Sequence, residues 1–254
     1  MRIRYVAIRR HSKARALGRQ ENEASWAGSP SPGRLGRRMA DHYFSAQPSV
    51  PSRPASVHLL LPDLDLELLA DRGVFSAGRV DPGTVALLRE SPAPPPRGEL
   101  LDLGCGYGPI ACALATKAPE ATVWAVDINE RAVALTAANA ARLGLANVRA
   151  TAPQEVPDGL VFAGIWSNPP IRAGKATLHT MLAQWLLRLC SGGRAWLVVS
   201  RHLGGDSLAA WLRTQSWDVR RLASKSGYRV LEVARAERPG GAANDPPAEL
   251  GWRA

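Results

Sequence analysis

The chain has 254 residues, of which 46% are hydrophobic, and it carries a net charge of +10 at pH 7. This length allows one substantial hydrophobic core. No apolar run approaches the roughly 20 residues that span a bilayer, and the N-terminus shows no signal-peptide core, so we expect a cytoplasmic protein with no membrane partner. Cys105, Cys112 and Cys190 form neither an even disulfide framework nor a metal-ligand spacing, so we expect reduced thiols and no metal site.

The two ends of the chain differ in composition from its middle. Residues 1–38 are rich in Arg, Ser, Gly and Pro without a hydrophobic period, which predicts a disordered basic extension. Two interpretations of this extension stay open: an artefact of start-site assignment, with Met39 as the true start, or a basic RNA-binding arm. Residues 39–238 are predicted to form a single domain, with a stiff proline-rich linker at 91–97, and residues 239–254 to form a flexible tail.

Short apolar strands alternate with helical segments along the predicted domain. Strands are expected at 100–103, 122–128, 148–151, 162–167 and 195–200. Helices are expected at 110–117, 130–143, 178–190 and 207–214, and a closing hairpin at 218–222 and 228–234. This order predicts an α/β, Rossmann-like fold with a seven-stranded, mostly parallel sheet, helices on both faces and a C-terminal antiparallel hairpin. Ligands of such sheets bind beyond the carboxyl ends of the strands.

Residues 102–108 read Asp-Leu-Gly-Cys-Gly-Tyr-Gly, between the first predicted strand and its helix. Glycine permits positive φ and a close approach of the backbone to a ligand. Asp102 can receive an ammonium group through the loop amides or water, and Asp127, 23 residues after Gly104, can accept the ribose hydroxyls of a nucleoside. A carboxylate directly before the glycines suits a cofactor with an amino-acid end better than a nicotinamide dinucleotide.

Residues 168–170 read Asn-Pro-Pro and follow the fourth predicted strand. Proline has no N–H, so we expect unpaired backbone carbonyls around Asn168. The Asn168 side-chain oxygen and the Pro169 carbonyl can hold the two N–H bonds of an amine that is conjugated to a ring or carbonyl. They can then aim the lone pair of the nitrogen at an electrophilic carbon, which makes these two residues the predicted catalytic pair.

The glycine loop with Asp127 resembles motifs I and II of class I S-adenosylmethionine-dependent methyltransferases, and Asn-Pro-Pro resembles motif IV of those that act on planar nitrogen. The resemblance implies S-adenosyl-L-methionine as cofactor, with its ribose on Asp127 and its adenine against Ile128. The residues implied around the methionine moiety are Asp102, Gly104, Cys105, Gly106 and Gly108. Residues 150–153 after the third strand contain no acid to read the adenine amino group, so we expect backbone groups at Ala152 to replace it.

Three separated segments, 74–84, 168–175 and 225–230, resemble the RsmC-type 16S ribosomal RNA guanine-N2 methyltransferases, and the match runs from about 42 to 236. This resemblance implies methylation of a guanine N2 amine, with ribosomal RNA or the small ribosomal subunit as partner, and we expect a monomer. The expected substrate-binding residues are Pro170, Ile171, Arg172 and Lys175, the last two on RNA phosphates. Ile171 stands where the family often has an aromatic residue, and the candidates for stacking are Phe75, Trp166 and Tyr228.

The charge of the chain is unevenly distributed. Residues 172–235 hold eleven Arg or Lys against three Asp or Glu, whereas residues 41–171 hold nine against fourteen. A basic rim around a pocket suits an enzyme that unstacks a base, although an arginine-rich genome is an alternative source of the charge. Two other functions stay open: a protein glutamine N5-methyltransferase that acts on release factors, and a nucleic-acid-binding module with a vestigial cofactor pocket.

Overall fold

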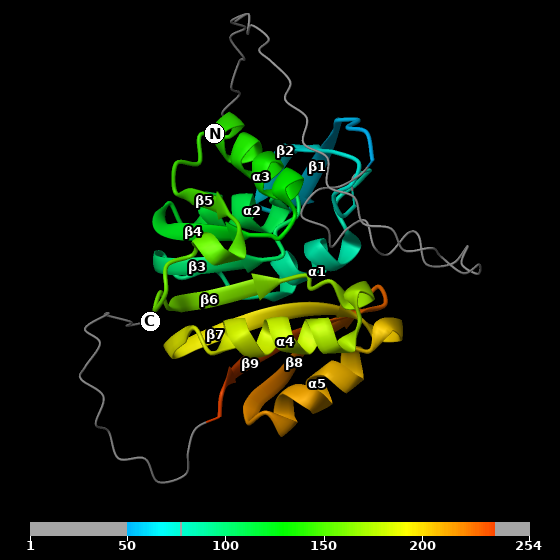
Figure 1. Ribbon diagram of the computed structural model, residues 1–254, viewed down its shortest axis with the longest axis vertical. Coiled ribbons are helices and arrows are strands. Elements are labelled where there is room, and N and C mark those ends of the chain that lie inside the picture. Colours follow the sequence, from blue (N-terminus) through cyan, green and yellow to red (C-terminus); the bar gives the residue numbers. More distant parts are fainter. Residues whose placement is uncertain (1–49, 77, 237–254) are drawn as a thin grey trace, which may run out of the picture. The chain divides into compact units, whose positions relative to one another are not determined.

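The computed structural model describes residues 50–76 and 78–236, which form a seven-stranded sheet and a separate two-stranded hairpin (Figure 1). The strand order of the sheet is β5-β4-β3-β6-β7-β9-β8. Its first five strands are mutually parallel, and β9 and β8 close it as an antiparallel hairpin. The Rossmann-like fold predicted from the sequence is therefore confirmed.

The elements of the sheet layer lie close to the predicted ranges. Its strands are β3 (Arg97–Leu103), β4 (Glu120–Val126), β5 (Val148–Thr151), β6 (Phe162–Ser167), β7 (Leu189–Ser200), β8 (Trp217–Lys225) and β9 (Tyr228–Arg235). The helices between them are α2 (Pro109–Lys117), α3 (Glu130–Arg142), α4 (Lys175–Leu186) and α5 (Gly205–Thr214). The predicted domain boundaries at 38 and 239 lie outside the described residues and stay predictions.

The border between α4 and β7 differs from the prediction. The helix was expected to continue to residue 190, but it ends at Leu186, and β7 already begins at Leu189 beside Phe162 of β6. The apolar run across this border fits a helix and a buried strand equally well, so periodicity alone could not separate them. The pairing with β6 decides for the strand, and a register shift between Phe162 and Gly164 accommodates the extra residues.

Three elements that the sequence pattern did not predict precede β3. Strands β1 (Ala55–Leu61) and β2 (Leu64–Ala70) form an antiparallel hairpin in which every second side chain is buried, from Val57 in β1 and from Leu66 in β2. Helix α1 (Pro82–Glu90) begins at Pro82, and Asp81 is its N-cap, accepting hydrogen bonds from the N–H groups of Gly83 and Thr84. Aspartate at the N-cap followed by proline at the first helical position is a regular helix-start signal.

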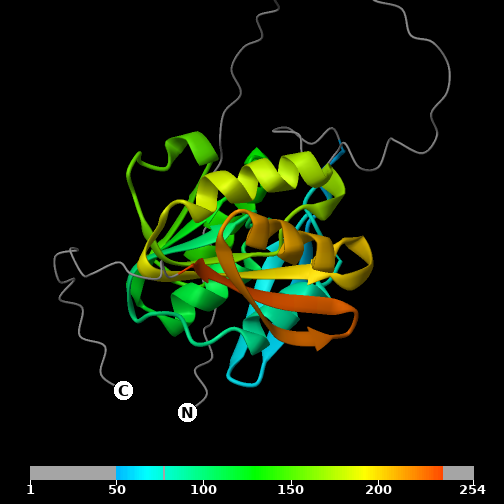
Figure 2. The ribbon, with the colours of Figure 1, turned by 90° about the horizontal axis from the view of Figure 1, so that it is seen from below.

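Two apolar layers lie on opposite faces of the sheet. The first contains the β1–β2 hairpin and the inner sides of α1, α2 and α3, and the second contains the inner sides of α4 and α5 (Figure 2). Successive strand residues alternate between the layers, as Leu100 and Leu101 do. Because helices cover both faces of the sheet, side chains that contact a ligand can lie only at the ends of its strands. No helix of the described residues is long and apolar enough to cross a membrane.

The packing of the hairpin yields a matched pair of variants. Leu59 is fully buried, whereas its neighbour Leu60 is 63% exposed. Leu59→Ala is expected to lower the free energy of unfolding by about 2–5 kcal/mol, and Leu60→Ala by less than about 0.5 kcal/mol. Urea denaturation of both variants measures the difference, and equal losses would show that the hairpin does not pack on the helices.

Candidate active site

The glycine loop between β3 and α2 has a left-handed backbone at three positions. Gly104, Gly106 and Gly108 have φ of +77°, +59° and +88°. A Cβ at Gly108 would lie 2.8 Å from the Thr136 side chain, whereas a Cβ at Gly104 would meet open space. The N–H groups of Gly104 and Cys105 both donate to the Val126 carbonyl, at 2.8 and 3.1 Å. The loop is thus fixed to the end of β4, with an open side at Gly104.

Asp102, on β3 just before the loop, is fully buried. Its Oδ2 accepts a hydrogen bond from the N–H of Ala111 at 2.9 Å, and its Oδ1 has no hydrogen-bond partner among the described residues. Burial raises the pKa of this carboxyl to about 8, and the nearby Asp127 carboxylate adds to the rise, against the Ala111 hydrogen bond. On its own the carboxyl is therefore mostly protonated at neutral pH, and a cationic ligand group beside Oδ1 would favour its ionised form.

Asp127 follows β4 directly and already holds one backbone N–H on each carboxylate oxygen. Gly106 donates to Oδ2 at 3.0 Å and Asn129 donates to Oδ1 at 2.9 Å. Burial raises the pKa of this carboxyl, while these hydrogen bonds oppose the rise. Each oxygen keeps a second acceptor position, so the carboxylate can still receive two hydroxyl groups. The next residue, Ile128, is an exposed apolar side chain that can lie against a flat ring.

The end of β5 carries an acid that the sequence analysis did not identify. Glu155 closes the short 3-10 helix η1 (Pro153–Glu155), and its Oε2 accepts from the Ala152 N–H at 3.2 Å and from the Thr151 hydroxyl. The Ala152 N–H, which was a candidate for reading the adenine amino group, therefore donates to a protein side chain. A carboxylate, that of Glu155, does lie after the third strand of the sequence-predicted set. The signal in the sequence was Pro153 followed by an acid in the first turn, which marks a helical turn.

The Asn168 amide has a fixed orientation. Its Nδ2 donates to Asp81 Oδ1 at 2.9 Å and to Thr84 Oγ1 at 3.1 Å. Both amide hydrogens are thus used within the protein, and Oδ1 is left to accept. Asp81 and Thr84 belong to the segment 74–84 that the sequence analysis singled out without assigning roles to them.

The backbone after Asn168 corrects one expectation. The Pro169 carbonyl, expected to be unpaired, accepts a hydrogen bond from the Ile171 N–H at 2.8 Å, and the Pro170 carbonyl accepts from Ala173 at 3.0 Å. The chain turns at once into the 3-10 helix η2 (Ile171–Ala173), so its own amides reach back to these carbonyls. The Pro169 oxygen keeps one free acceptor position.

Asp81 connects three elements that are far apart in the sequence. As the N-cap of α1 it holds Asn168 at the end of β6, and its Oδ2 accepts from the hydroxyl of Tyr228, the first residue of β9, at 3.4 Å. Burial raises the pKa of the Tyr228 hydroxyl, and the Asp81 carboxylate adds to the rise, so the hydroxyl stays a donor at neutral pH. Tyr228 thus helps to fix the Asp81 carboxylate, which in turn holds the Asn168 amide.

The glycine loop and Asn168 face one hollow. Its lining includes Phe75, Asp81, Thr84, Gly104, Gly106 and Asn168. Of the candidate stacking residues, Trp166 is fully buried and stacks on Trp196 at 4.4 Å, so it is excluded. Tyr228 is half-buried, and Phe75 is 51% exposed at the rim. Phe75 is thus the aromatic group best placed for an incoming ring.

The expected substrate-binding residues lie just beyond this hollow. Arg172 in η2 and Lys175 at the start of α4 are exposed, and their side chains make no hydrogen bond or ion pair with another described residue. Pro170 and Ile171 are half-buried, and Ile171 packs against the apolar layer under α4. The charges of Arg172 and Lys175 are therefore not neutralised by described residues, and Ile171 is part of the hydrophobic core.

The sheet, the glycine loop with its two acids and the Asn-Pro-Pro turn together define a class I S-adenosylmethionine-dependent methyltransferase. Residues 65–232 match the methyltransferase small domain family, and the chain belongs to this family. An uncharacterized protein, YbxB, of Bacillus subtilis (strain 168) is 34% identical over 200 residues, which cover 78% of this chain and all of that protein.

Two further relatives are ribosomal RNA methyltransferases. Ribosomal RNA small subunit methyltransferase C of Ectopseudomonas mendocina (strain ymp) is 33% identical over 196 residues, covering 75% of this chain and 57% of that protein. The T. thermophilus 16S rRNA N2 G1207 methyltransferase (RsmC), solved with AdoMet and guanosine, is similar with a TM-score of 0.63 and 26% identity, covering 74% of this chain and 52% of that one. The chain thus spans little more than half the length of these two methyltransferases.

The buried Asp102 carboxyl predicts a pH dependence of stability. Its pKa rises from an ordinary 3.8 to about 8 on folding, so the folded state binds the proton more tightly than the unfolded state does. Its contribution is fully present below about pH 4 and is lost as the pH rises toward 8. Asp102→Asn is therefore expected to gain stability relative to the natural protein across this window. Thermal melts between pH 5 and 8 measure this, and a pH-independent difference would contradict it.

Proposed function

We propose that this protein methylates the exocyclic N2 amine of a guanine in small-subunit ribosomal RNA, with S-adenosyl-L-methionine as methyl donor. The observation that carries the proposal is the orientation of Asn168. Its amide nitrogen is held by Asp81 and Thr84, which leaves Oδ1 as an acceptor in the hollow that the glycine loop also lines. An acceptor fixed beside a methyl-donor site is what an amine substrate requires.

The residues around the loop fit the cofactor. The unpartnered Asp102 Oδ1 suits the ammonium end, directly or through water, and the Asp127 carboxylate suits the ribose hydroxyls. The loop backbone of Gly104, Cys105, Gly106 and Gly108 lies between them and would follow the methionine moiety. Ile128 and the Glu155–Ala152 turn lie beyond Asp127, where an adenine ring and its amino group would be read. When bound, the cofactor supplies a sulfonium methyl carbon that a nitrogen lone pair can attack.

The Asn168–Pro169 pair supplies the positioning that a conjugated amine needs. The lone pair of guanine N2 is delocalised into the ring, so the amine is a weak nucleophile in its planar form. Two acceptors, Asn168 Oδ1 and the free position on the Pro169 carbonyl, can hold its two N–H bonds and favour the pyramidal form. They also stabilise the positive charge that develops on nitrogen as the new bond forms, without a base of shifted pKa.

The positive charge next to the hollow favours RNA as the substrate. Arg172 and Lys175 are free cations next to Asn168, and residues 172–235 carry a large excess of positive charge. A base that must enter the hollow has to leave its stack, and phosphate contacts by such cations fix the strand while it does so. We infer a monomer that acts in the cytoplasm on ribosomal RNA or the small subunit.

Transfer of labelled methyl groups tests the substrate. Small subunits, free small-subunit ribosomal RNA, large-subunit RNA and a release factor are each incubated with the protein and labelled cofactor. Label in the small-subunit RNA, recovered as N2-methylguanosine after digestion, is the expected result. Label only in the release factor, or only in another nucleoside, would overturn the proposal.

Asn168→Ala is expected to abolish turnover, because the amine loses its side-chain acceptor, while the cofactor affinity stays within about twofold of the natural protein. Single-turnover methylation and calorimetric titration with the cofactor measure the two properties. Unchanged turnover in this variant would remove the proposed mechanism.

Asp81→Ser tests the positioning role, because a single oxygen, Asp81 Oδ1, accepts both from the N–H groups of α1 and from the Asn168 amide. Serine keeps an N-cap acceptor for α1, but the carboxylate charge that holds the Asn168 amide is lost. We expect kcat to fall by about 10²-fold with little change in melting temperature or in the KM for the cofactor. Thr84→Ser, which keeps a hydroxyl, serves as the matched control, and equal kcat values in the two variants would contradict this role of Asp81.

A further inference from the structure

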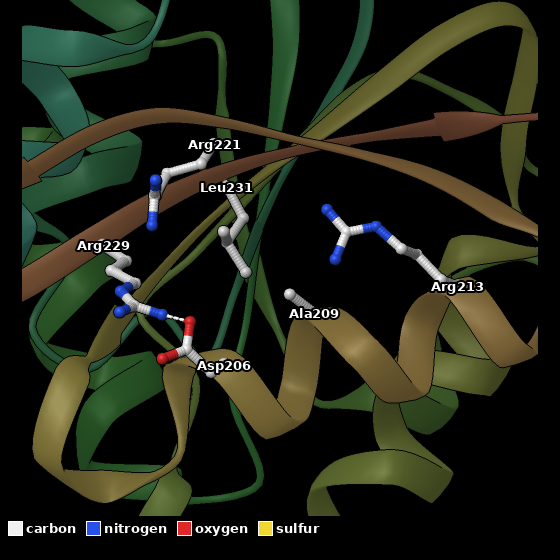
Figure 3. Close-up of a pocket in the computed structure, with 6 residues that line it drawn as sticks. All are labelled: Asp206, Ala209, Arg213, Arg221, Arg229 and Leu231. Atoms are coloured by element: carbon white, nitrogen blue, oxygen red, sulfur yellow. Dashed lines mark ion pairs between the residues drawn. The ribbon is translucent and has the colours of Figure 1, made fainter.

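A second concave site lies between α5 and the β8–β9 hairpin. It is a cavity of about 240 Å³ (Figure 3). Its lining comes from α5 with Asp206, Ala209 and Arg213, from β8 with Arg221, and from β9 with Arg229 and Leu231. Figure 3 shows Arg221 and Arg229 on one side of Leu231 and Arg213 on the other, so three guanidinium groups border one apolar floor.

The charges of this cavity are only partly compensated. Asp206 forms an ion pair with Arg229. Arg213 uses one donor on the Val219 carbonyl at 2.7 Å, and the Arg221 side chain makes no hydrogen bond or ion pair with a described residue. The net charge of the lining is therefore +2, so the cavity favours the binding of an anion over that of a neutral ligand.

One donor in the cavity wall is buried and unsatisfied. The Nε of Arg229 is buried and has no hydrogen-bond partner among the described residues, and the Arg229 side chain is only 12% exposed. This N–H is closed to solvent, so a ligand in the cavity would contact Arg229 through its terminal guanidinium nitrogens. A phosphate offers several oxygens to guanidinium groups that converge from different elements, which suits this geometry better than a single carboxylate does.

The cavity lies at the same end of the sheet as Asn168, on the opposite face. In β9, Tyr228 and Arg229 are consecutive, so their side chains point to opposite faces: Tyr228 to Asp81 and Arg229 to α5. Arg229 pairs with Val199 near the carboxyl end of β7. Strand β7 alone separates β9 from β6, a distance of about 10 Å between the outer two strands. An RNA strand whose target base enters the hollow at Asn168 can therefore place a neighbouring phosphate at the cavity, across the carboxyl end of β7.

We propose that this cavity, the arginine pocket, binds a backbone phosphate of the RNA next to the target base. The proposal rests on the proposed function, because it takes the substrate to be RNA. The phosphate is held by the guanidinium groups of Arg221, Arg213 and Arg229, while Asp206 limits the affinity by neutralising one of these three cations.

Arg221→Ala tests the pocket, and Arg142→Ala on the exposed end of α3 is its matched control with the same loss of charge. Binding of a small-subunit ribosomal RNA transcript is measured over a series of salt concentrations. Loss of one phosphate contact in single-stranded RNA reduces the slope of log K against log salt by about 0.7. We expect this reduction and a severalfold weaker affinity for Arg221→Ala, and the natural slope for Arg142→Ala.

Asp206→Asn tests the same pocket with the opposite sign. Removing this carboxylate frees Arg229, so RNA affinity should rise and the salt slope should steepen, whereas Asp158→Asn in the exposed loop before β6 should leave the slope unchanged. Circular dichroism confirms that each variant is folded.

The outcomes separate the two proposals. If the natural protein binds and methylates the RNA but Arg221→Ala and Asp206→Asn match their controls, the arginine pocket is wrong and the proposed function stands. If the natural protein binds only a protein substrate and no RNA, both proposals fall.

Discussion

The site depends on one hydrogen-bonded contact, in which the Asn168 amide nitrogen is held by Asp81 and Thr84. An amide can present either its oxygen or its nitrogen to a substrate, and these contacts assign the nitrogen to the protein. The oxygen is then available to a group that donates hydrogen bonds, as the exocyclic amine of the proposed substrate does. The proposed positioning of the nucleophile and the proposed choice of substrate both require this orientation.

The fold brings the parts of this contact together at one end of the sheet. Asn168 follows β6, Asp81 caps α1, and Tyr228 begins β9, so three segments meet although 87 residues separate Asp81 from Asn168. The glycine loop after β3 and Asp127 after β4 end at the same edge, because parallel strands share it. On the opposite face, Arg229 lines the arginine pocket. A cofactor region, an acceptor and a cationic surface are thus adjacent without a separate domain.

Much of this arrangement was predictable, because it depends on local chemistry. The left-handed backbone at Gly104, Gly106 and Gly108 needs glycine, and strands alternating with helices predict the parallel sheet. What could not be predicted depends on tertiary contacts. The roles of Asp81 and of Glu155, the hydrogen bond that occupies the Pro169 carbonyl and the convergence of three arginines around one cavity require the packed structure. The end of α4 was missed because pairing with β6, rather than local propensity, starts β7 at Leu189.

The most direct test is a crystal structure with the demethylated cofactor and guanosine bound together. The account predicts that guanine N2 lies within hydrogen-bond distance of Asn168 Oδ1 and faces the cofactor sulfur, while Nδ2 remains on Asp81 and Thr84. A structure in which Oδ1 points away from the base, or in which Nδ2 contacts it, would contradict the account.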